Sequence, residues 1–177
     1  MSSFPPTLSN SILLLSKYIP TLEDSIAKKS ADPQAIEKIG NLFGYPLTTD
    51  LISWLQHYNG MEISGTGFYS AETILSDIDA VNIEMKFLPI ASDLCGNRFV
   101  AIYSIDSINP PIGFVSRSFG YNKIYSLISS SFNHFLYLTI LSCLTRREKS
   151  HWPYDADYVL KYDPEVKNFG IPLASET

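Results

Sequence analysis

The spacing of apolar residues changes twice along this chain of 177 residues, and no other feature constrains the fold as much. In the first third, apolar residues recur at helical intervals. The clearest case places four of them on one helix face: Leu51, Trp54, Leu55 and Tyr58. A threonine at 48 or 49 is the expected N-cap of this helix, and Asn59-Gly60 its expected end.

Three further helices are predicted in the first third from their end signals. They cover about residues 8–19, 21–29 and 33–43. The last has the strongest signals, because Asp32 suits the N-cap and Pro33 the first helical position. Gly44 then supplies the C-terminal stop.

The middle of the chain reads as strands instead. Runs rich in branched and aromatic residues predict strands at 87–91, 98–103 and 112–115. The turn Asn109-Pro110-Pro111 between the last two predicts an antiparallel pair. Pro89 has no N–H for a ladder, so we expect its strand at a sheet edge or at a bend.

Weaker signals surround these strands. Gly65-Thr66-Gly67 predicts a turn with a strand starting at Phe68, and residues 71–81 read as a short helix or an irregular link. A long buried helix is predicted over 129–145, with these residues inward: Phe132, Phe135, Leu136, Ile140 and Cys143. A short helix is expected near 155–162. Helices, then strands, then a helix predict an α+β class.

Composition narrows the class of protein. A hydrophobic fraction of 45% with 18% charged residues excludes a disordered chain. A net charge of −5 argues against nucleic-acid binding, which needs a surplus of Lys and Arg. Two cysteines, no secretory signal pattern and no apolar run of membrane-spanning length favour a cytoplasmic protein without membrane contact.

The search for catalytic and metal-binding motifs finds isolated residues only. His57 and His134 lie in apolar helices, and Cys95 lies in a turn without a neighbour that lowers its pKa. The close acid pairs are Asp77-x-Asp79 and Asp155-x-Asp157. The sequence therefore predicts no catalytic residue, metal or cofactor. A Cys95–His pair and a divalent ion between two carboxylates stay as alternatives.

The charge distribution is uneven. No Lys or Arg occurs between Lys38 and Lys86, and this interval carries a charge of −6 from six acids: Asp50, Glu62, Glu72, Asp77, Asp79 and Glu84. These acids form one patch that attracts a cationic partner, or they scatter over several faces. Nearby aromatics are either interface anchors or core. The residues predicted to contact a partner are Glu62, Glu72, Asp77, Asp79, Glu84 and Tyr69.

Three blocks follow one another at a specific spacing. They are Leu51–Gly60 (LISWLQHYNG), Phe87–Asn97 (FLPIASDLCGN) and Ile128–Leu136 (ISSSFNHFL). In this order they resemble the SUKH superfamily over about residues 36 to 141. The sequence departs from the family pattern at Pro46-Leu47, which reverses the usual Leu-Pro, and at Phe87, where Trp is more typical.

The resemblance implies an α+β domain with helices packed on a mixed or antiparallel sheet. We expect this core at 36–145, with a helical extension at 1–35 packed on it and a tail with a short helix at 146–177. Most bacterial members resemble immunity proteins that bind and block a toxin domain. Some fungal relatives regulate cell-wall assembly and signalling through protein contacts. Neither role is catalytic, so the resemblance implies a non-enzymatic protein.

The resulting hypothesis is an immunity protein whose acidic face masks the basic groove of a cognate toxin domain, such as a nuclease. It acts in the cytoplasm as a monomer or homodimer, without nucleic acid. The alternatives are a regulatory scaffold of the same fold and a small enzyme that uses Asp77, Asp79 or Cys95.

Overall fold

Six strands form one sheet in the order in which they occur along the chain, each antiparallel to the next. The computed structural model describes residues 7–18, 30–63, 65–78, 86–121, 123–144 and 154–173. The strands are β1 (Met61–Ile63), β2 (Thr66–Phe68), β3 (Phe87–Asp93), β4 (Arg98–Ile102), β5 (Ile112–Val115) and β6 (Ile124–Ser129). The predicted helix at 21–29 lies outside the described residues, as do Asp79 and Glu84.

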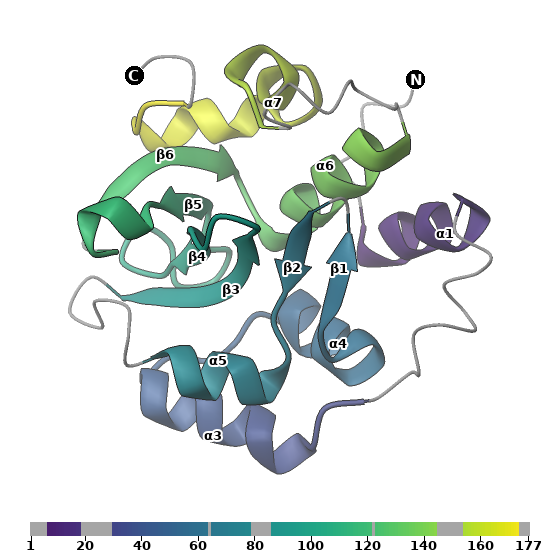
Figure 1. Ribbon diagram of the computed structural model, residues 1–177, viewed down its shortest axis with the longest axis vertical. Helices are drawn as coiled ribbons and strands as arrows, with labels where there is room; N and C mark the ends of the chain where they lie inside the picture. Colours follow the sequence, from purple (N-terminus) through teal and green to yellow (C-terminus); the bar gives the residue numbers. More distant parts are fainter. Residues whose placement is uncertain are drawn as a thin grey trace.

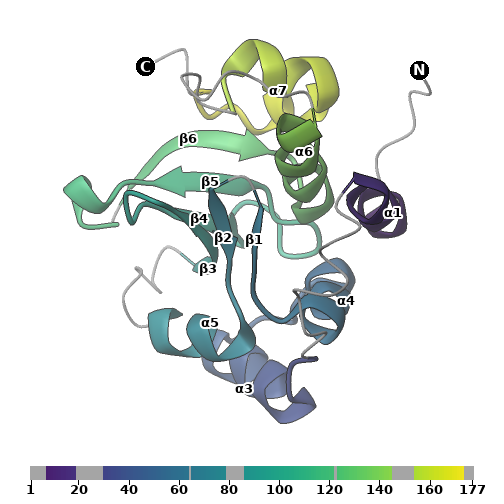
Figure 2. The same cartoon turned by 45° about the vertical axis from the view of Figure 1, so that its right-hand side comes forward.

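Helices cover both faces of this sheet. They are α1 (Leu8–Tyr18), α3 (Pro33–Phe43), α4 (Thr49–Tyr58), α5 (Ala71–Asp77), α6 (Phe132–Leu144) and α7 (Ala156–Tyr162), with 3-10 turns η3 (Arg117–Phe119) and η4 (Pro164–Phe169). In Figures 1 and 2, α3 and α5 lie together on one side of the sheet and α6 and α7 on the other. The predicted α+β class is confirmed. Within the described ranges, no helix has the length and apolar character to cross a bilayer.

The predicted ends of α3 are confirmed. The Asp32 carboxylate accepts the Gln34 N–H at 2.9 Å, and Pro33 is the first helical residue. Gly44 closes the helix with a φ of +76°, a conformation that costs glycine nothing. At α4 the predicted cap is Thr48, whose hydroxyl accepts the Leu51 N–H. Local side-chain chemistry is sufficient to place these helix ends.

The core is built around aromatic side chains on α6 and the strands it covers. The Phe135 ring lies 5.0 Å from Phe99 and 5.3 Å from Phe68, measured between centroids. Tyr154 packs 5.6 Å from Phe135, and its buried hydroxyl bonds to Thr66 and Thr139. Of the residues predicted inward on α6, all are buried except Cys143, which is half-buried.

Two strand predictions need correction. Pro89 is not in an edge strand, since β3 pairs with both β2 and β4. The alternative of a bend is correct, because the β3–β4 register shifts between Pro89 and Ala91. β2 ends opposite Ala91, so its ladder stops before the proline. Phe68 ends β2 instead of starting a strand, because Gly67 pairs with Ser92 inside the ladder.

β6 was not predicted from the sequence, and the helix predicted to start at 129 begins at Phe132. Ser129 is the last residue of β6, although a serine run there reads as a helix cap. The last four residues of β6 are all buried, so the strand lacks the apolar–polar alternation that would have indicated it. The tail forms the predicted short helix as α7, and Leu173 adds a parallel bridge to Leu127.

Candidate interaction surfaces

Asn59 joins the end of α4 to the start of α5. Its side-chain carbonyl accepts the Ala71 N–H at 2.7 Å, and its amide donates to Glu72 Oε2 at 3.1 Å. Gly60 follows with a φ of +89°, and a Cβ there would lie 3.2 Å from that of Ser70. The Asn-Gly pair thus serves the close packing of two helix ends. It leaves Glu72 exposed at the surface.

Glu62 is exposed at the centre of β1, between the buried Met61 and Ile63. β1 is the terminal strand of the sheet in the β1-to-β6 order. A charged residue on such a strand discourages pairing with another chain and leaves its carboxylate accessible. Among the residues predicted to contact a partner, Glu62 and Glu72 are the two that the structure shows as exposed.

Asp77 forms an ion pair with Arg98, a contact that the sequence did not predict. Arg98 Nε donates to Asp77 Oδ2 at 2.7 Å, and Nη2 donates to Oδ1 at 2.8 Å. The two side chains are only 11% and 22% exposed. Burial alone would lower the pKa of Arg98, but the hydrogen bonds and charge of Asp77 outweigh it and raise that pKa. Asp77 therefore contributes little free negative charge to the surface.

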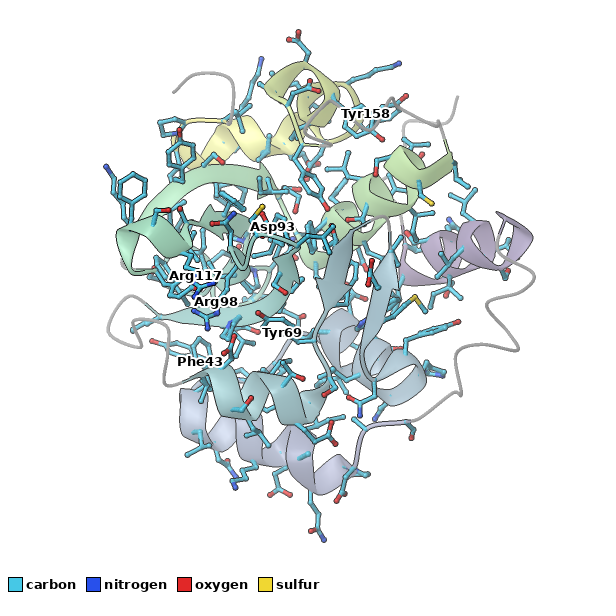
Figure 3. The ribbon with its side chains drawn as sticks, viewed as in Figure 1. Phe43, Tyr69, Asp93, Arg98, Arg117 and Tyr158 are labelled. Atoms are coloured by element: carbon cyan, nitrogen blue, oxygen red, sulfur yellow. The ribbon has the colours of Figure 1, made fainter. Side chains whose placement is uncertain are left out.

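Tyr69 and Tyr121 complete the surroundings of this ion pair. Burial raises the pKa of the half-buried Tyr69, and the charge of Asp77 adds to the effect. The Arg98 guanidinium carbon lies 3.7 Å from the centroid of the Tyr121 ring. Within the described residues, Arg98 Nη1 is buried with no hydrogen-bond acceptor, and the ring's electron-rich face compensates in part. Figure 3 shows Tyr69 and Arg98 near one another.

The predicted acidic residues are thus not equivalent. Glu62 and Glu72 are exposed. Asp77 and Tyr69 both lie next to Arg98. Asp50 accepts a hydrogen bond from the Asn133 amide at 2.6 Å. In the sequence, Arg98 is the next cation after Lys86 and lies 21 residues from Asp77. Sequence spacing alone did not show that α5 and β4 would bring these two residues together.

The Asp93–Asn97 turn between β3 and β4 is organised by one carboxylate. Asp93 Oδ1 accepts the N–H groups of Cys95 and Asn97, both at 2.9 Å, and Oδ2 accepts the Asn97 amide at 2.8 Å. Gly96 adopts a φ of +79° within the turn. Asn97 Oδ1 in turn accepts the Arg117 N–H at 3.1 Å. Asp93, Gly96 and Asn97 of the Phe87–Asn97 block therefore fix the turn.

A buried polar network contains a Ser, a His and an Asp, the residue types of a hydrolase triad. Its geometry differs: Ser130 Oγ donates to Asp163 Oδ1 at 2.7 Å and lies 3.1 Å from His134 Nδ1. His134 Nε2 is 3.9 Å from Asp163 Oδ1. All three side chains are buried, so the hydroxyl is not presented to a substrate. The network fastens the tail to the β6–α6 junction.

The other candidates for chemistry are separated. Cys95 is exposed at the β3–β4 turn, and the exposed His57 has Nδ1 2.7 Å from the Ser53 carbonyl on α4. Asp155 caps α7 by accepting the Tyr158 N–H, which accounts for it without a metal. Among the residues that the structure describes, no three His, Cys, Asp or Glu side chains gather closely enough to hold a metal ion.

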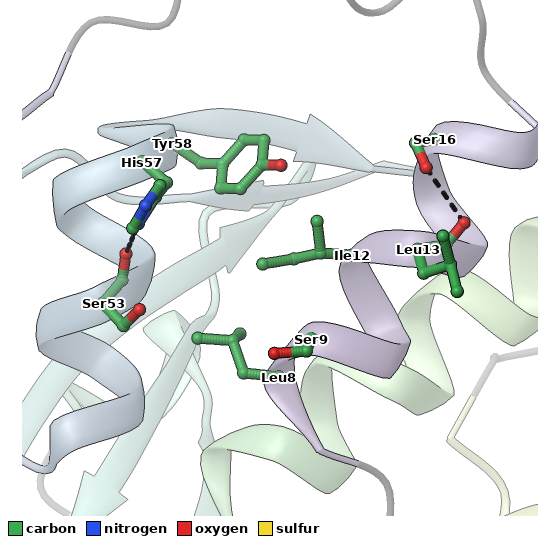
Figure 4. Close-up of a pocket in the computed structure, with 8 residues that line it drawn as sticks. All are labelled: Leu8, Ser9, Ile12, Leu13, Ser16, Ser53, His57 and Tyr58. Atoms are coloured by element: carbon green, nitrogen blue, oxygen red, sulfur yellow. Dashed lines mark hydrogen bonds between the residues drawn. The ribbon is translucent and has the colours of Figure 1, made fainter.

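An open groove of about 370 Å³ lies between α1 and α4 (Figure 4). Its lining residues are Leu8, Ser9, Ile12, Leu13, Ser16, Ser53, His57 and Tyr58. Leu13 is 56% exposed at its rim. The lining contains no carboxylate, Lys or Arg, so the groove offers apolar contact and hydroxyl groups rather than charge.

A comparison with known protein families matches a part of the chain that includes the whole sheet. The pattern that defines the SMI1 / KNR4 family (SUKH-1) matches residues 30–138. This range begins before α3, contains all six strands and ends within α6. No curated protein matches the chain. Because the match covers more than half of the sequence, the chain belongs to the SMI1 / KNR4 family, SUKH-1.

Proposed function

We propose that this chain is an immunity protein that binds a cognate bacterial toxin domain and blocks it sterically. The family match over residues 30–138 is the observation that carries the proposal. SUKH proteins include toxin-immunity proteins and regulators, are generally non-catalytic and act through protein–protein contacts. In this proposal the chain is cytoplasmic, acts as a monomer or homodimer, and meets the toxin domain before it damages the cell.

The acidic interval supplies the proposed contact surface. Its exposed members in the described residues are Glu62 and Glu72, and the proposal extends to Asp79 and Glu84. The half-buried Tyr69, which follows β2, is proposed as an aromatic anchor of the same contact. Asp77 has a smaller role here than its charge suggests, since Arg98 neutralises it.

The mechanism follows from electrostatics and shape. A toxin that acts on nucleic acid needs a basic groove, and exposed carboxylates are attracted to such a groove at long range. Attraction of this kind raises the association rate, whereas close packing sets the dissociation rate. The toxin is inactive while its substrate groove is covered, and no bond is made or broken by the immunity protein.

Survival of cells tests the function directly. Where a large secreted protein with a variable C-terminal domain is encoded next to this chain, that domain is expressed from an inducible promoter, with and without the chain. We expect toxicity from the domain alone and growth when both are present. Loss of viability in both cultures, with the chain stably expressed, would show that it does not confer immunity to that domain.

The surface is tested separately by charge reversal. The variant Glu62→Lys/Glu72→Lys is expected to lower the association rate toward the toxin domain roughly tenfold at low salt and to weaken its salt dependence. The control Glu37→Lys/Glu165→Lys makes the same change in net charge at exposed positions on α3 and η4. Equal rates for the two variants would refute the acidic surface while leaving immunity possible.

A regulatory scaffold is the second candidate, because the family includes regulators as well as immunity proteins. Both candidate functions depend on protein contacts, so the fold and the surface charge of the chain do not distinguish an immunity protein from a scaffold. The separating observation is the identity of the partner. A stable complex with a non-toxic polypeptide, combined with no protection against the neighbouring domain, would favour the scaffold.

A further inference from the structure

Three strand connections lie at one end of the sheet. In an antiparallel sheet with this order, the β1–β2, β3–β4 and β5–β6 connections all fall on the same side. The register agrees, since Thr66 pairs with Asp93, Arg98 with Val115, and Val115 with Ile124. Loops that a rigid sheet gathers in this way are common binding surfaces.

Contacts between the connections hold them together. The Leu94 side chain packs over Gly65, 3.7 Å from the position of a Cβ there, and Arg117 packs 3.4 Å from that of Gly96. Asn97 accepts the Arg117 N–H, and the Tyr121 hydroxyl donates to the Gly96 carbonyl at 2.8 Å. Figure 3 shows Asp93, Arg98 and Arg117 at this end. A surface already ordered in this way loses little conformational entropy when a partner binds.

Large apolar side chains are exposed here, and none of the described helices or strands covers them. Leu94 is 83% exposed, Phe119 62% and Tyr125 43%. The Phe119 and Tyr125 rings are stacked, with centroids 6.4 Å apart and planes 12° from parallel. Exposed aromatics of this kind are the side chains that most often anchor an interface when a partner buries them.

Two cations accompany these apolar groups. Arg117 and Lys123 are exposed, and no carboxylate of the described residues lies within 4 Å of either. Two acids near this end are already engaged: Asp93 by the N–H groups of its own turn, and Asp77 by Arg98. The exposed Glu62 lies on β1, two strands away from β3. Arg117 and Lys123 both belong to the β5–β6 connection, which is therefore a positive region of a chain with a net charge of −5. Leu94, Arg117, Phe119, Lys123 and Tyr125 are called the turn surface below.

We propose that the turn surface binds an acidic polypeptide segment that carries at least one large apolar side chain. The carboxylates of the segment pair with Arg117 and Lys123, and its apolar side chain packs on Leu94 or on the Phe119–Tyr125 stack. This is a second surface with the opposite charge to the one proposed for a basic toxin, and it does not depend on that proposal. A single-stranded nucleic acid also uses cations and aromatics, but two cations on an acidic protein give it too few phosphate contacts.

A random twelve-residue peptide library displayed on phage, selected on the immobilised full chain, tests the proposal. We expect the enriched peptides to be acidic with at least one large apolar residue. Their affinity, measured by fluorescence anisotropy, is expected to fall at least about tenfold in Arg117→Glu/Lys123→Glu and in Phe119→Ser/Tyr125→Ser. The control Lys38→Glu/Lys167→Glu changes two exposed cations elsewhere and is expected to bind normally.

A reciprocal selection makes the test sharper. The same library selected on Arg117→Glu/Lys123→Glu is expected to yield basic peptides, because the chemistry of the surface has been reversed. All four substituted positions are exposed, so the substitutions are expected to leave the chain folded. A thermal melt of each variant checks that a loss of binding does not come from unfolding. Selected peptides without acidic residues, or equal binding by all variants, would overturn the proposal. So would tighter binding of a single-stranded oligonucleotide, or a dimer of the chain that Phe119→Ser disrupts.

Discussion

Asp163 accepts both the backbone N–H and the hydroxyl of Ser130, at 2.6 and 2.7 Å. The carboxylate is fully buried, and it lies 33 residues after its partner. A buried carboxylate is tolerable only where hydrogen bonds replace the water that it has lost. These hydrogen bonds therefore connect the residue that follows α7 to the junction between β6 and α6.

Removing that carboxylate should weaken the whole fold. We predict that Asp163→Asn lowers the free energy of unfolding by about 1–3 kcal/mol, because the Ser130 N–H or hydroxyl is left buried without an acceptor. Urea unfolding followed by circular dichroism measures the change. Glu165→Gln, an exposed change two residues away, should alter it by less than about 0.5 kcal/mol. Equal midpoints for the two variants would contradict this role.

The Asp77–Arg98 pair should behave as a coupled unit. Asp77→Leu leaves a guanidinium that is mostly buried without its anion, and Arg98→Met leaves the carboxylate. We predict that the double variant loses less stability than the two single variants added together, with a coupling free energy of about 1–3 kcal/mol. A double-mutant cycle in urea measures it. Strictly additive losses would show that the two side chains do not stabilise one another.

Two glycine-to-alanine changes should have opposite signs. A Cβ at Gly113 in β5 would lie 2.7 Å from Ile102 Cδ1 and 3.2 Å from Ile124 Cγ2, so Gly113→Ala should cost about 1–3 kcal/mol of stability. At Gly40 in α3 the nearest atom would be 3.6 Å away. Gly40→Ala should therefore stabilise the chain by about 0.5–1 kcal/mol through helix propensity. Thermal melts compare the two, and a shift in the same direction would refute the packing argument.

Buried tyrosines predict loss of stability at alkaline pH. Burial raises the pKa of Tyr103 and of Tyr154 to about 12, from an ordinary value of 10.0. Both phenols are neutral in folded and unfolded chains below pH 10, so their contribution is complete there. Between pH 10 and about 12 only the unfolded chain ionises, and stability falls as pH rises. Absorbance at 295 nm should show these tyrosines titrating together with alkaline unfolding; their ionisation near pH 10 in the folded protein would contradict the prediction.

Features encoded by neighbouring residues were predictable from the sequence. Asp32, Pro33 and Gly44 mark the ends of α3 because a cap needs only local hydrogen bonds and one positive φ. The apolar face of α4 and the buried character of α6 follow from spacing and composition in the same way. Fold class and family were therefore accessible without a structure.

Features that depend on distant partners were not accessible. β6 is a strand because β5 pairs with it and Pro172 accepts the Leu127 N–H, and neither partner is adjacent in sequence. The same applies to the site: the charge count treated Asp77 like Glu62, but the fold places Arg98 against only one of them. Counting charges along a chain does not show which of them the fold neutralises.

The central claim is that this chain acts by covering another protein. The most direct measurement titrates the purified chain into a purified candidate toxin domain while the activity of that domain is recorded. The account predicts that activity falls in proportion to added chain and ends at equimolar concentration, with no change in any substrate caused by the chain alone. Full toxin activity in the presence of excess folded chain would contradict it.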